Sequence, residues 1–356
     1  MTGATDTTEH VHDWQATGVS VSAIERELSA LWRPEVGGGA DDRAIAMRTS
    51  ALNLVVYTES AAAAELAAET ISRLAGSHPS RAIIVEAEPH HETSSLDASL
   101  SAHCHLAATG QGKFCCEQVT ITVKGEAAEH VGGVVAPLLL PDLPTVVWWQ
   151  GAPPLASRAF QRLTEVADRL IIDSEAFGGG ASAWQAVREL QSALGDNREL
   201  VDLAWARLAP WRETIALAFD DPHHRPLAYG LHTLTVTVSG PAAPDAPAAV
   251  SLLASWLATA TGQAPTVLVQ ADPSAEGRAG DLLALTLDAA AGEHTLRLRL
   301  WRAGNSTALE HQVTLDGVAG AQRRALLAPA DDALLLAREL ESYGRDALYE
   351  AALAAM

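Results

Sequence analysis

The sequence predicts an α/β protein of two domains: a mostly parallel, doubly wound N-terminal domain and a second α+β domain that contains an antiparallel sheet. In the first two thirds of the chain, short apolar runs alternate with helical segments, as buried parallel strands and their crossover helices do. Beyond about residue 226, apolar residues alternate with polar ones, as in half-exposed antiparallel strands. A chain of 356 residues is also too long for one ordinary core and sufficient for two.

The first domain, 46–221, follows a strand–helix rhythm. The apolar run at 52–57 (LNLVVY) predicts a buried strand, and Ser60 is placed to cap the alanine-rich helix after it. A second buried strand is expected at 82–86 (AIIVE). The other elements expected here are strands at 99–107, 118–123, 145–149 and 170–173 and helices at 127–140, 155–166, 182–193 and 204–219.

The two ends of the chain differ from this pattern. Residues 1–45 predict a loose N-terminal arm with a short helix at 19–32 and a flexible break at the three glycines 37–39. Residues 220–226 (DDPHHRP) contain two prolines and no periodicity, so we place the domain boundary there. The second domain, 228–356, is expected to contain strands at 233–238, 282–287 and 295–301, a hairpin turn at 290–293, and helices at 248–261 and 331–355.

Composition excludes several function classes. A formal net charge of −20 disfavours a general nucleic-acid binder and an anionic membrane surface as partner, because both need clustered Lys and Arg. No run approaches the roughly 18 apolar residues of a transmembrane helix. The first fifteen residues lack the charged and apolar regions of a signal peptide. We therefore expect a cytoplasmic protein.

The motifs of nucleotide binding and catalysis are missing. The strand at 52–57 is followed by Thr-Glu-Ser-Ala with no glycine before Gly76, so the glycine-rich dinucleotide fingerprint is absent. The glycines at 132–133 and 178–180 lack the Lys and Ser/Thr of a phosphate-binding loop. Paired acids such as 331–332 fit helix starts, where carboxylates are stabilised by the helix dipole. We expect no catalytic residue, no bound cofactor and no enzymatic activity.

Soft metal ligands gather in one short part of the chain, as His-Cys-His at 103–105 and Cys-Cys-Glu at 115–117. On extended strands neighbouring side chains diverge, so Cys104 faces away from both histidines and Cys115 faces away from Cys116. A zinc site, a redox-sensing thiol and buried structural cysteines all stay open, and the geometry favours the last. Three cysteines so close together do not suggest the disulfide framework of a secreted protein.

A composite motif at 136–153, APLLLPDLPTVVWWQGAP, resembles the glucose-6-phosphate dehydrogenase assembly protein family, OpcA. The likeness covers 46–262 well and the rest of the chain weakly. Its other segments, in the same order, are LNLVVY at 52–57, HPSRAIIVE at 78–86, CCEQVTI at 115–121, ADRLIIDS at 167–174, DLAWARLAPWRETIALAFD at 202–220 and SWLATATG at 255–262.

This resemblance implies a non-catalytic protein that binds glucose-6-phosphate dehydrogenase and promotes its active oligomer, which supports NADP metabolism and the oxidative pentose phosphate pathway. Activation by assembly and activation by an allosteric shift both remain open. Redox control is associated with cyanobacterial members of the family. From the residues alone, the alternatives are a metabolite-sensing α/β regulatory module and a thiol or metal redox protein that uses residues 103–116.

Aromatic and arginine side chains are the candidate contacts with the dehydrogenase, since they supply most of the energy at interfaces. Trp148 and Trp149 are adjacent at a strand end and face opposite sides, so one can enter the core while the other contacts a covering helix or a partner. Arg158 follows them and has a second interpretation, a solvated position on a helix.

A denser set of the same residue types lies at 205–212, where Trp205, Arg207, Trp211 and Arg212 surround a proline. The two arginines can engage carboxylates on the dehydrogenase, or they can stack on tryptophans of this chain. Both interpretations remain open. In an acidic protein, a basic and aromatic patch is suited to orient a partner without driving non-specific association.

Overall fold

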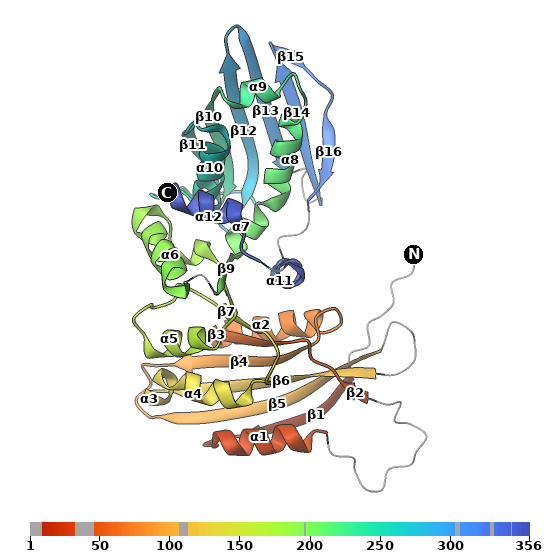
Figure 1. The fold of residues 1–356 in the computed structure, drawn as a ribbon, viewed down its shortest axis with the longest axis vertical. Coiled ribbons are helices and arrows are strands. Elements are labelled where there is room, and N and C mark those ends of the chain that lie inside the picture. Colours follow the sequence, from red (N-terminus) through yellow and green to blue (C-terminus); the bar gives the residue numbers. More distant parts are fainter. Residues whose placement is uncertain are drawn as a thin grey trace. The chain divides into compact units, whose positions relative to one another are not determined.

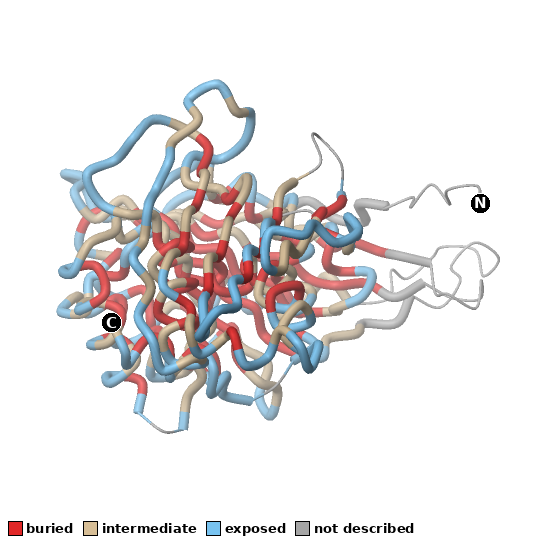
Figure 2. The backbone as a smooth tube through the Cα atoms, turned by 90° about the horizontal axis from the view of Figure 1, so that it is seen from above, coloured by how far each residue is buried: buried red, intermediate tan, exposed pale blue. Residues whose placement is uncertain are grey.

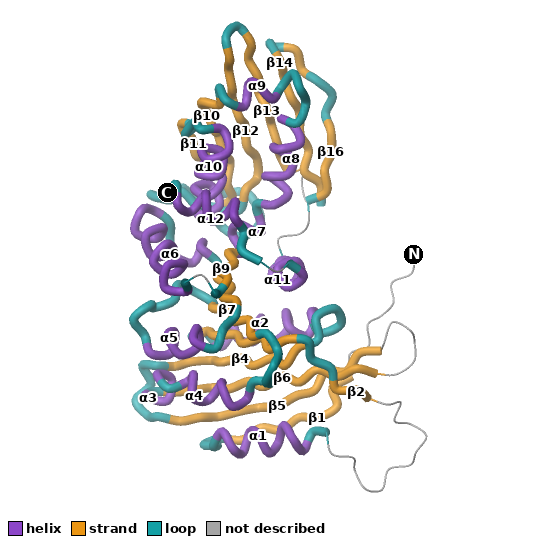
Figure 3. The backbone as a smooth tube through the Cα atoms, viewed as in Figure 1, coloured by secondary structure: helices purple, strands orange, loops and turns teal. Residues whose placement is uncertain are grey.

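The computed structural model describes residues 9–32, 46–106, 113–195, 197–302, 307–327, 331–342 and 344–356, although not the side chains of 9–13, 46–48, 105–106 and 113–114. The chain divides into two compact units, each built around one sheet (Figures 1 and 3). Unit 1 comprises the described parts of Met1–Ile172, Leu194–Val201 and Leu336–Tyr343. Unit 2 comprises Asp173–Ala193, Asp202–Leu335 and Gly344–Met356.

Sheet A forms the centre of unit 1. Its middle strands β6, β4, β3, β7 and β8 are mutually parallel, and β5 and β1 extend it with antiparallel pairs. This confirms the mostly parallel sheet that the sequence predicts. In spatial order the described strands are β1 (Glu9–Ala16), β5 (Ser95–Leu106), β6 (Lys113–Lys124), β4 (Ser80–Glu88), β3 (Leu52–Thr58), β7 (Thr145–Trp149), β8 (Arg169–Ile172) and β9 (Glu199–Asp202), with β2 (Ala46–Arg48) beside β6.

The central strands of sheet A form because their apolar residues run without interruption. Every residue of β3, β7 and β8 is buried, as expected for strands covered on both faces. Helix α2 (Ala61–Leu74) begins where Ser60 accepts a hydrogen bond from the Ala63 amide at 3.3 Å, the predicted cap. Figure 2 colours the backbone by burial, with the buried stretches in red and the exposed ones in pale blue.

The expectation of a loose N-terminal arm is wrong for residues 9–16. They form β1, which pairs with β5 in antiparallel register. An edge strand gains its stability from backbone hydrogen bonds on one side and needs no apolar pattern, so the polar sequence gives no signal. Helix α1 (Val21–Ala30) lies within the expected range, and the glycines at 37–39 lie outside the described residues.

Two helices expected as continuous are interrupted. The segment 127–140 forms α3 (Glu126–Glu129), α4 (Val131–Val135) and the 3-10 turn η1 (Ala136–Leu138), because it contains two glycines and a proline. Gly132 is required for packing, since a Cβ there would lie 2.4 Å from the Arg162 Cβ of helix α5 (Arg158–Glu165). The segment 331–355 forms α11 (Asp332–Glu341) and α12 (Ala347–Ala354).

Unit 2 contains sheet B, which is antiparallel except at one edge, where β11 runs parallel to β10. Helix α10 (Ala248–Thr261) connects these two parallel strands. Figure 1 shows α8, α9 and α10 along the same face of the sheet. In spatial order the described strands are β11 (Thr266–Asp272), β10 (Leu231–Ser239), β12 (Leu282–Ala291), β13 (His294–Arg302), β14 (Ala308–Leu315) and β15 (Val318–Ala319), with β16 (Arg323–Leu326) also beside β14.

The division of the chain differs from the predicted boundary at 220–226. The units separate after Ile172, so η2 (Ser174–Phe177), most of α6 (Gly180–Leu194), α7 (Leu203–Arg207) and α8 (Ala209–Phe219) group with sheet B. The proline-containing segment 220–226 includes the start of the short helix α9 (Arg225–Ala228) and lies inside unit 2. Among the described residues, no helix has the length and apolar character needed to cross a membrane.

A buried ion pair joins two central strands of sheet A. Arg81 of β4 donates its Nε to Glu117 of β6 at 2.7 Å and its Nη1 to the Leu138 carbonyl at 2.8 Å. Trp32 donates to the same carboxylate. The Glu117 side chain is fully buried, so its charge is compensated by hydrogen bonds and by the arginine instead of water.

This pair predicts an asymmetry between single and double substitutions. Glu117→Leu should lower the free energy of unfolding by about 3 kcal/mol or more, because Arg81 remains charged, buried and without its carboxylate. Adding Arg81→Met should recover part of the loss. Urea denaturation of the two single variants and the double variant measures the coupling; additive losses would contradict the interpretation.

Candidate partner interface

The two adjacent tryptophans of β7 face opposite sides of sheet A, and both are buried. Trp148 and Trp149 are 4% and 2% exposed. Trp149 stacks on Tyr57 with ring centroids 3.9 Å apart and meets the edge of Phe160 at 5.2 Å. Neither side chain is exposed for contact with a partner in this conformation. The sequence left a partner contact open for one of the two tryptophans, and in the structure both lie in the core.

The segment 205–212 turns its aromatic side chains inward in unit 2. Trp205 and Trp211 are 5% and 1% exposed. The indole Nε1 of Trp205 donates to Asp346 at 2.7 Å, and the Arg212 guanidinium lies 3.5 Å from the centroid of the Trp205 ring. Of the two interpretations of Arg212, the structure describes the one in which it stacks on a tryptophan of its own chain.

Arg207 also engages carboxylates of this chain. Its two Nη atoms bind Asp173 at 3.0 and 2.6 Å, and Nη2 lies 3.4 Å from Asp332. Arg278 approaches the same Asp173 carboxylate at 2.8 Å. Burial alone would raise the pKa of Asp173, but the hydrogen bonds and charges of Arg207 and Arg278 outweigh it and lower this pKa. Asp173 is therefore a charged anchor between two arginines.

Two further carboxylates, the half-buried Glu175 and the buried Asp202, fix helix starts around this anchor. Glu175 accepts hydrogen bonds from the amides of Ala249 at 2.8 Å and Ala248 at 3.2 Å, which caps α10. Burial raises the pKa of Glu175, and these two amide hydrogen bonds partly offset the effect. Each contact satisfies backbone donors that a helix start leaves unpaired.

Asp202 caps α7 from inside unit 2. Its Oδ1 accepts from the amides of Ser174 at 2.9 Å and Ala204 at 3.0 Å, and its Oδ2 accepts from the Tyr349 hydroxyl at 3.2 Å. Burial raises the pKa of Asp202 to about 6. Burial likewise raises the pKa of Tyr349, with the Asp202 charge as a second cause, so the tyrosine remains a neutral donor.

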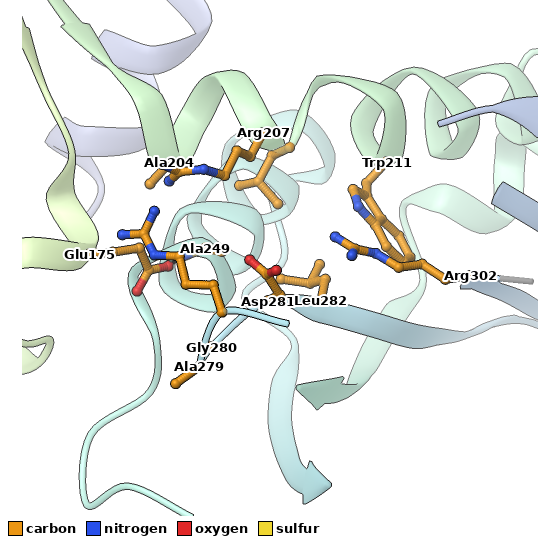
Figure 4. A pocket seen from close by; sticks show the side chains of 12 residues that line it. Glu175, Ala204, Arg207, Trp211, Ala249, Ala279, Gly280, Asp281, Leu282 and Arg302 are labelled. Carbon is orange, nitrogen blue, oxygen red and sulfur yellow. Dashed lines mark hydrogen bonds between the residues drawn. The ribbon is translucent and has the colours of Figure 1, made fainter. Parts of the chain in front are cut away.

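A small cavity lies beside this network (Figure 4). Its lining includes Arg207, Trp211, Arg278, Asp281 and Arg302, with the Arg302 guanidinium close to the Trp211 ring in the close-up. The cavity measures about 20 Å³, which is room for one water molecule. Three arginines and the two acids Glu175 and Asp281 line it, and its volume is too small for a substrate or cofactor.

The structure therefore brings together Trp205, Arg207, Trp211 and Arg212. Their contacts are with one another and with acidic residues of this chain. Sequence reasoning missed those acids. Asp202, directly before an apolar helical run, carries the signal of a helix cap, and Asp173 follows a strand end. Arg158 is the exception among the seven candidates: it is exposed and forms no ion pair within the described residues.

The three cysteines lie on two neighbouring strands and face both sides of sheet A. Cys104 of β5 and Cys115 of β6 are opposite one another, with Cα atoms 4.1 Å apart, and form a disulfide that we did not expect from the sequence. Cys116 faces the other side of the sheet and is a buried free thiol. Burial raises its pKa to about 11, which keeps it protonated and unreactive near neutral pH.

No group of three or more potential metal ligands meets within the part of the chain that is described, although the side chain of His105 lies outside that part. His103 is buried on β5, where its Nε2 lies 3.2 Å from the Ser101 hydroxyl. The sequence did contain a signal for the disulfide pair: in two consecutive antiparallel strands, counting residues outward from their connection places Cys104 opposite Cys115.

Comparison with known proteins places the chain in one family. The glucose-6-phosphate dehydrogenase subunit N-terminal domain family matches residues 71–189, and the corresponding C-terminal domain family matches 198–353. These matches define the class, a protein built from two glucose-6-phosphate dehydrogenase subunit domains. The chain belongs to the OpcA family, the glucose-6-phosphate dehydrogenase assembly proteins, as the motif at 136–153 predicts.

Curated relatives carry the same family name. The putative OxPP cycle protein OpcA of Synechocystis is 38% identical over 153 residues, which cover 43% of this chain and 31% of the relative. The protein of that name from Nostoc punctiforme is 31% identical over 169 residues, covering 47% and 35%. The chain thus spans about a third of these relatives. A 3-ketoreductase of Actinomadura kijaniata, crystallised with NADP, shares 10% identity and a TM-score of 0.38 over 87% of this chain and 94% of the other, too low to carry an argument.

The environment of Asp202 predicts a pH-dependent stability. Its pKa of about 6 in the folded chain exceeds the ordinary 3.8, so wild-type stability should fall as the pH rises from about 4 to about 6. Asp202→Asn keeps an acceptor for both amides and removes the charge. The stability of this variant relative to wild type should therefore rise over that window, by up to about 3 kcal/mol. Urea unfolding at pH 4, 5, 6 and 7 measures it; a constant difference would contradict the buried carboxylate.

Burial of Trp211 predicts a structural role for this residue. Trp211→Ala should lower the free energy of unfolding by about 3–5 kcal/mol, because it removes a 1% exposed aromatic side chain. The exposed Arg158→Ala should change it by less than about 0.5 kcal/mol. Chemical denaturation of both variants provides the comparison, and a Trp211→Ala protein as stable as wild type would argue against the described packing.

Proposed function

We propose that this chain is a non-catalytic partner of glucose-6-phosphate dehydrogenase that binds the enzyme and promotes its active oligomer. The observation that carries the proposal is the family membership of the chain, whose two matching domains bear the name of a glucose-6-phosphate dehydrogenase subunit. The curated relatives add the link to the oxidative pentose phosphate pathway through their name. On this proposal the chain acts in the cytoplasm and influences NADP metabolism only through its partner.

The chemistry of unit 2 supports a non-catalytic role. Its most concentrated set of ionisable groups, around Asp173, Glu175 and Asp202, is committed to ion pairs and helix caps. A general base needs a substrate within hydrogen-bond reach. Asp173 and Asp202 line neither the cavity of about 20 Å³ nor the larger pocket of about 490 Å³ beside Glu175, and the Glu175 carboxylate is engaged by the first amides of α10. Groups held in this way stabilise the fold of unit 2, which agrees with a non-catalytic role.

Two mechanisms of activation are thermodynamically distinct. An assembly factor needs only contacts that exist in the oligomer, so its effect disappears once the dehydrogenase is fully assembled by high concentration. An allosteric activator must bind the high-affinity state of the enzyme more tightly than the low-affinity state, and its effect persists at any enzyme concentration. The dependence of activation on dehydrogenase concentration separates them.

Titration into the cognate dehydrogenase tests the proposal. We expect a saturable rise in NADPH formation at subsaturating glucose-6-phosphate, with no NADPH from this chain alone. Repeating the titration at several dehydrogenase concentrations distinguishes assembly from allostery. The proposal fails if activity stays unchanged and the two proteins also elute separately in size-exclusion chromatography.

A further inference from the structure

A groove distinct from the Figure 4 cavity opens at one end of unit 2. It lies between the end of α8 and strands β14, β15 and β16, and it measures about 410 Å³, compared with about 20 Å³ for the cavity. Helix α8 contacts β13, β14 and β16, and Figure 1 shows it alongside β14. The groove has room for several side chains of another molecule.

At the groove, no helix of the described residues covers the face of sheet B along which α8, α9 and α10 lie. On β13, Leu296 and Leu298 are 2% and 0% exposed beneath the helices. Their neighbours across the ladder, Leu315 and Val313 of β14, lie on the same face but are only half-buried. The floor of the groove is thus apolar sheet surface that continues beyond the end of the helix layer.

Two exposed apolar side chains project from the walls of the groove. Leu217 of α8 is 68% exposed and Val318 of β15 is 73% exposed, and both line the concavity. Single exposed apolar residues are ordinary on protein surfaces. A concave site with an apolar floor and two exposed apolar walls is instead typical of a binding groove.

The rim of the groove is basic, although the chain carries a net charge of −20. Arg323 and Arg324 line it, together with the imidazoles of His224 and His311 and against the one acid Asp221. Arg324 pairs with Glu310 at 2.8 Å, whereas Arg323 is exposed and has no ion pair within the described residues. Burial and the charge of Arg323 lower the pKa of His311, so this histidine is neutral near pH 7 and the arginines carry the positive charge of the rim. The two arginines of the rim therefore favour an occupant that carries carboxylates.

We propose that this groove binds a surface segment of the partner protein that carries aliphatic side chains, such as leucine, with carboxylates beside them. The apolar floor fits aliphatic side chains, and the arginine rim complements carboxylates beside them. A sugar phosphate would leave Leu217, Val318, Val313 and Leu315 without apolar contacts. The inference rests on the proposed function, in which the segment belongs to glucose-6-phosphate dehydrogenase, and it assigns the contact to the Leu217–Val318 groove instead of the buried residues at 205–212.

Matched charge substitutions test this site. Leu217→Asp and Val318→Asp place a carboxylate in the groove, and Arg323→Glu reverses the rim charge. The control is Leu348→Asp, since Leu348 is 57% exposed, lies on α12 in the same unit and does not line the groove. All four positions are at the surface, so we expect the variants to fold, with melting temperatures close to that of wild type.

Binding of each variant to the immobilised dehydrogenase is measured at two salt concentrations. We expect Leu217→Asp and Val318→Asp to weaken binding at least tenfold, Leu348→Asp to leave it unchanged, and Arg323→Glu to weaken it while reducing its salt dependence. Wild-type affinity in all groove variants would overturn this inference and leave the proposed function standing. Equal weakening by Leu348→Asp would also overturn it. Failure of the wild-type chain to bind would overturn the proposed function itself.

Discussion

Satisfaction of the buried and half-buried carboxylates is the constraint on which unit 2 depends. A carboxylate removed from water is tolerated only when hydrogen bonds or opposite charges replace its hydration. Asp173 meets this condition through Arg207 and Arg278, Glu175 through the start of α10, and Asp202 through the start of α7 and Tyr349. Together these contacts fix where two helices begin and how the segment 205–212 is oriented.

That orientation decides which part of α8 is available for binding. With Arg207 tied to Asp173 and Trp205 to Asp346, the first half of α8 buries Trp211, Thr214 and Ile215 at helical spacing. Leu217 falls off this stripe and is exposed beside the groove. The residues most suggestive of an interface therefore stabilise the fold, while the exposed surface they leave is aliphatic with a basic rim.

Local patterns predicted much of the fold and little of the interface. Strands such as β3 and β7 were predictable because their burial on both faces requires continuous apolar sequence. The polar edge strand β1 gave no such signal. Tryptophan and arginine at 205–212 indicate strong contacts without identifying the partner, and here the acids that engage Arg207 lie 34 and 125 residues away in sequence. The groove consists of side chains that tertiary packing leaves exposed. In the sequence, the one signal for it is that Leu217 lies outside the buried stripe of α8.

Hydrogen exchange with and without the dehydrogenase tests this account most directly, because it reports backbone protection along the whole chain. Saturating partner should slow exchange at the end of α8 and in β14–β16, around residues 217–224 and 311–324, while α7 and the start of α8 exchange as in the free chain. Protection confined to residues 203–212, with none at the groove, would contradict it and return the contact to the tryptophan–arginine segment.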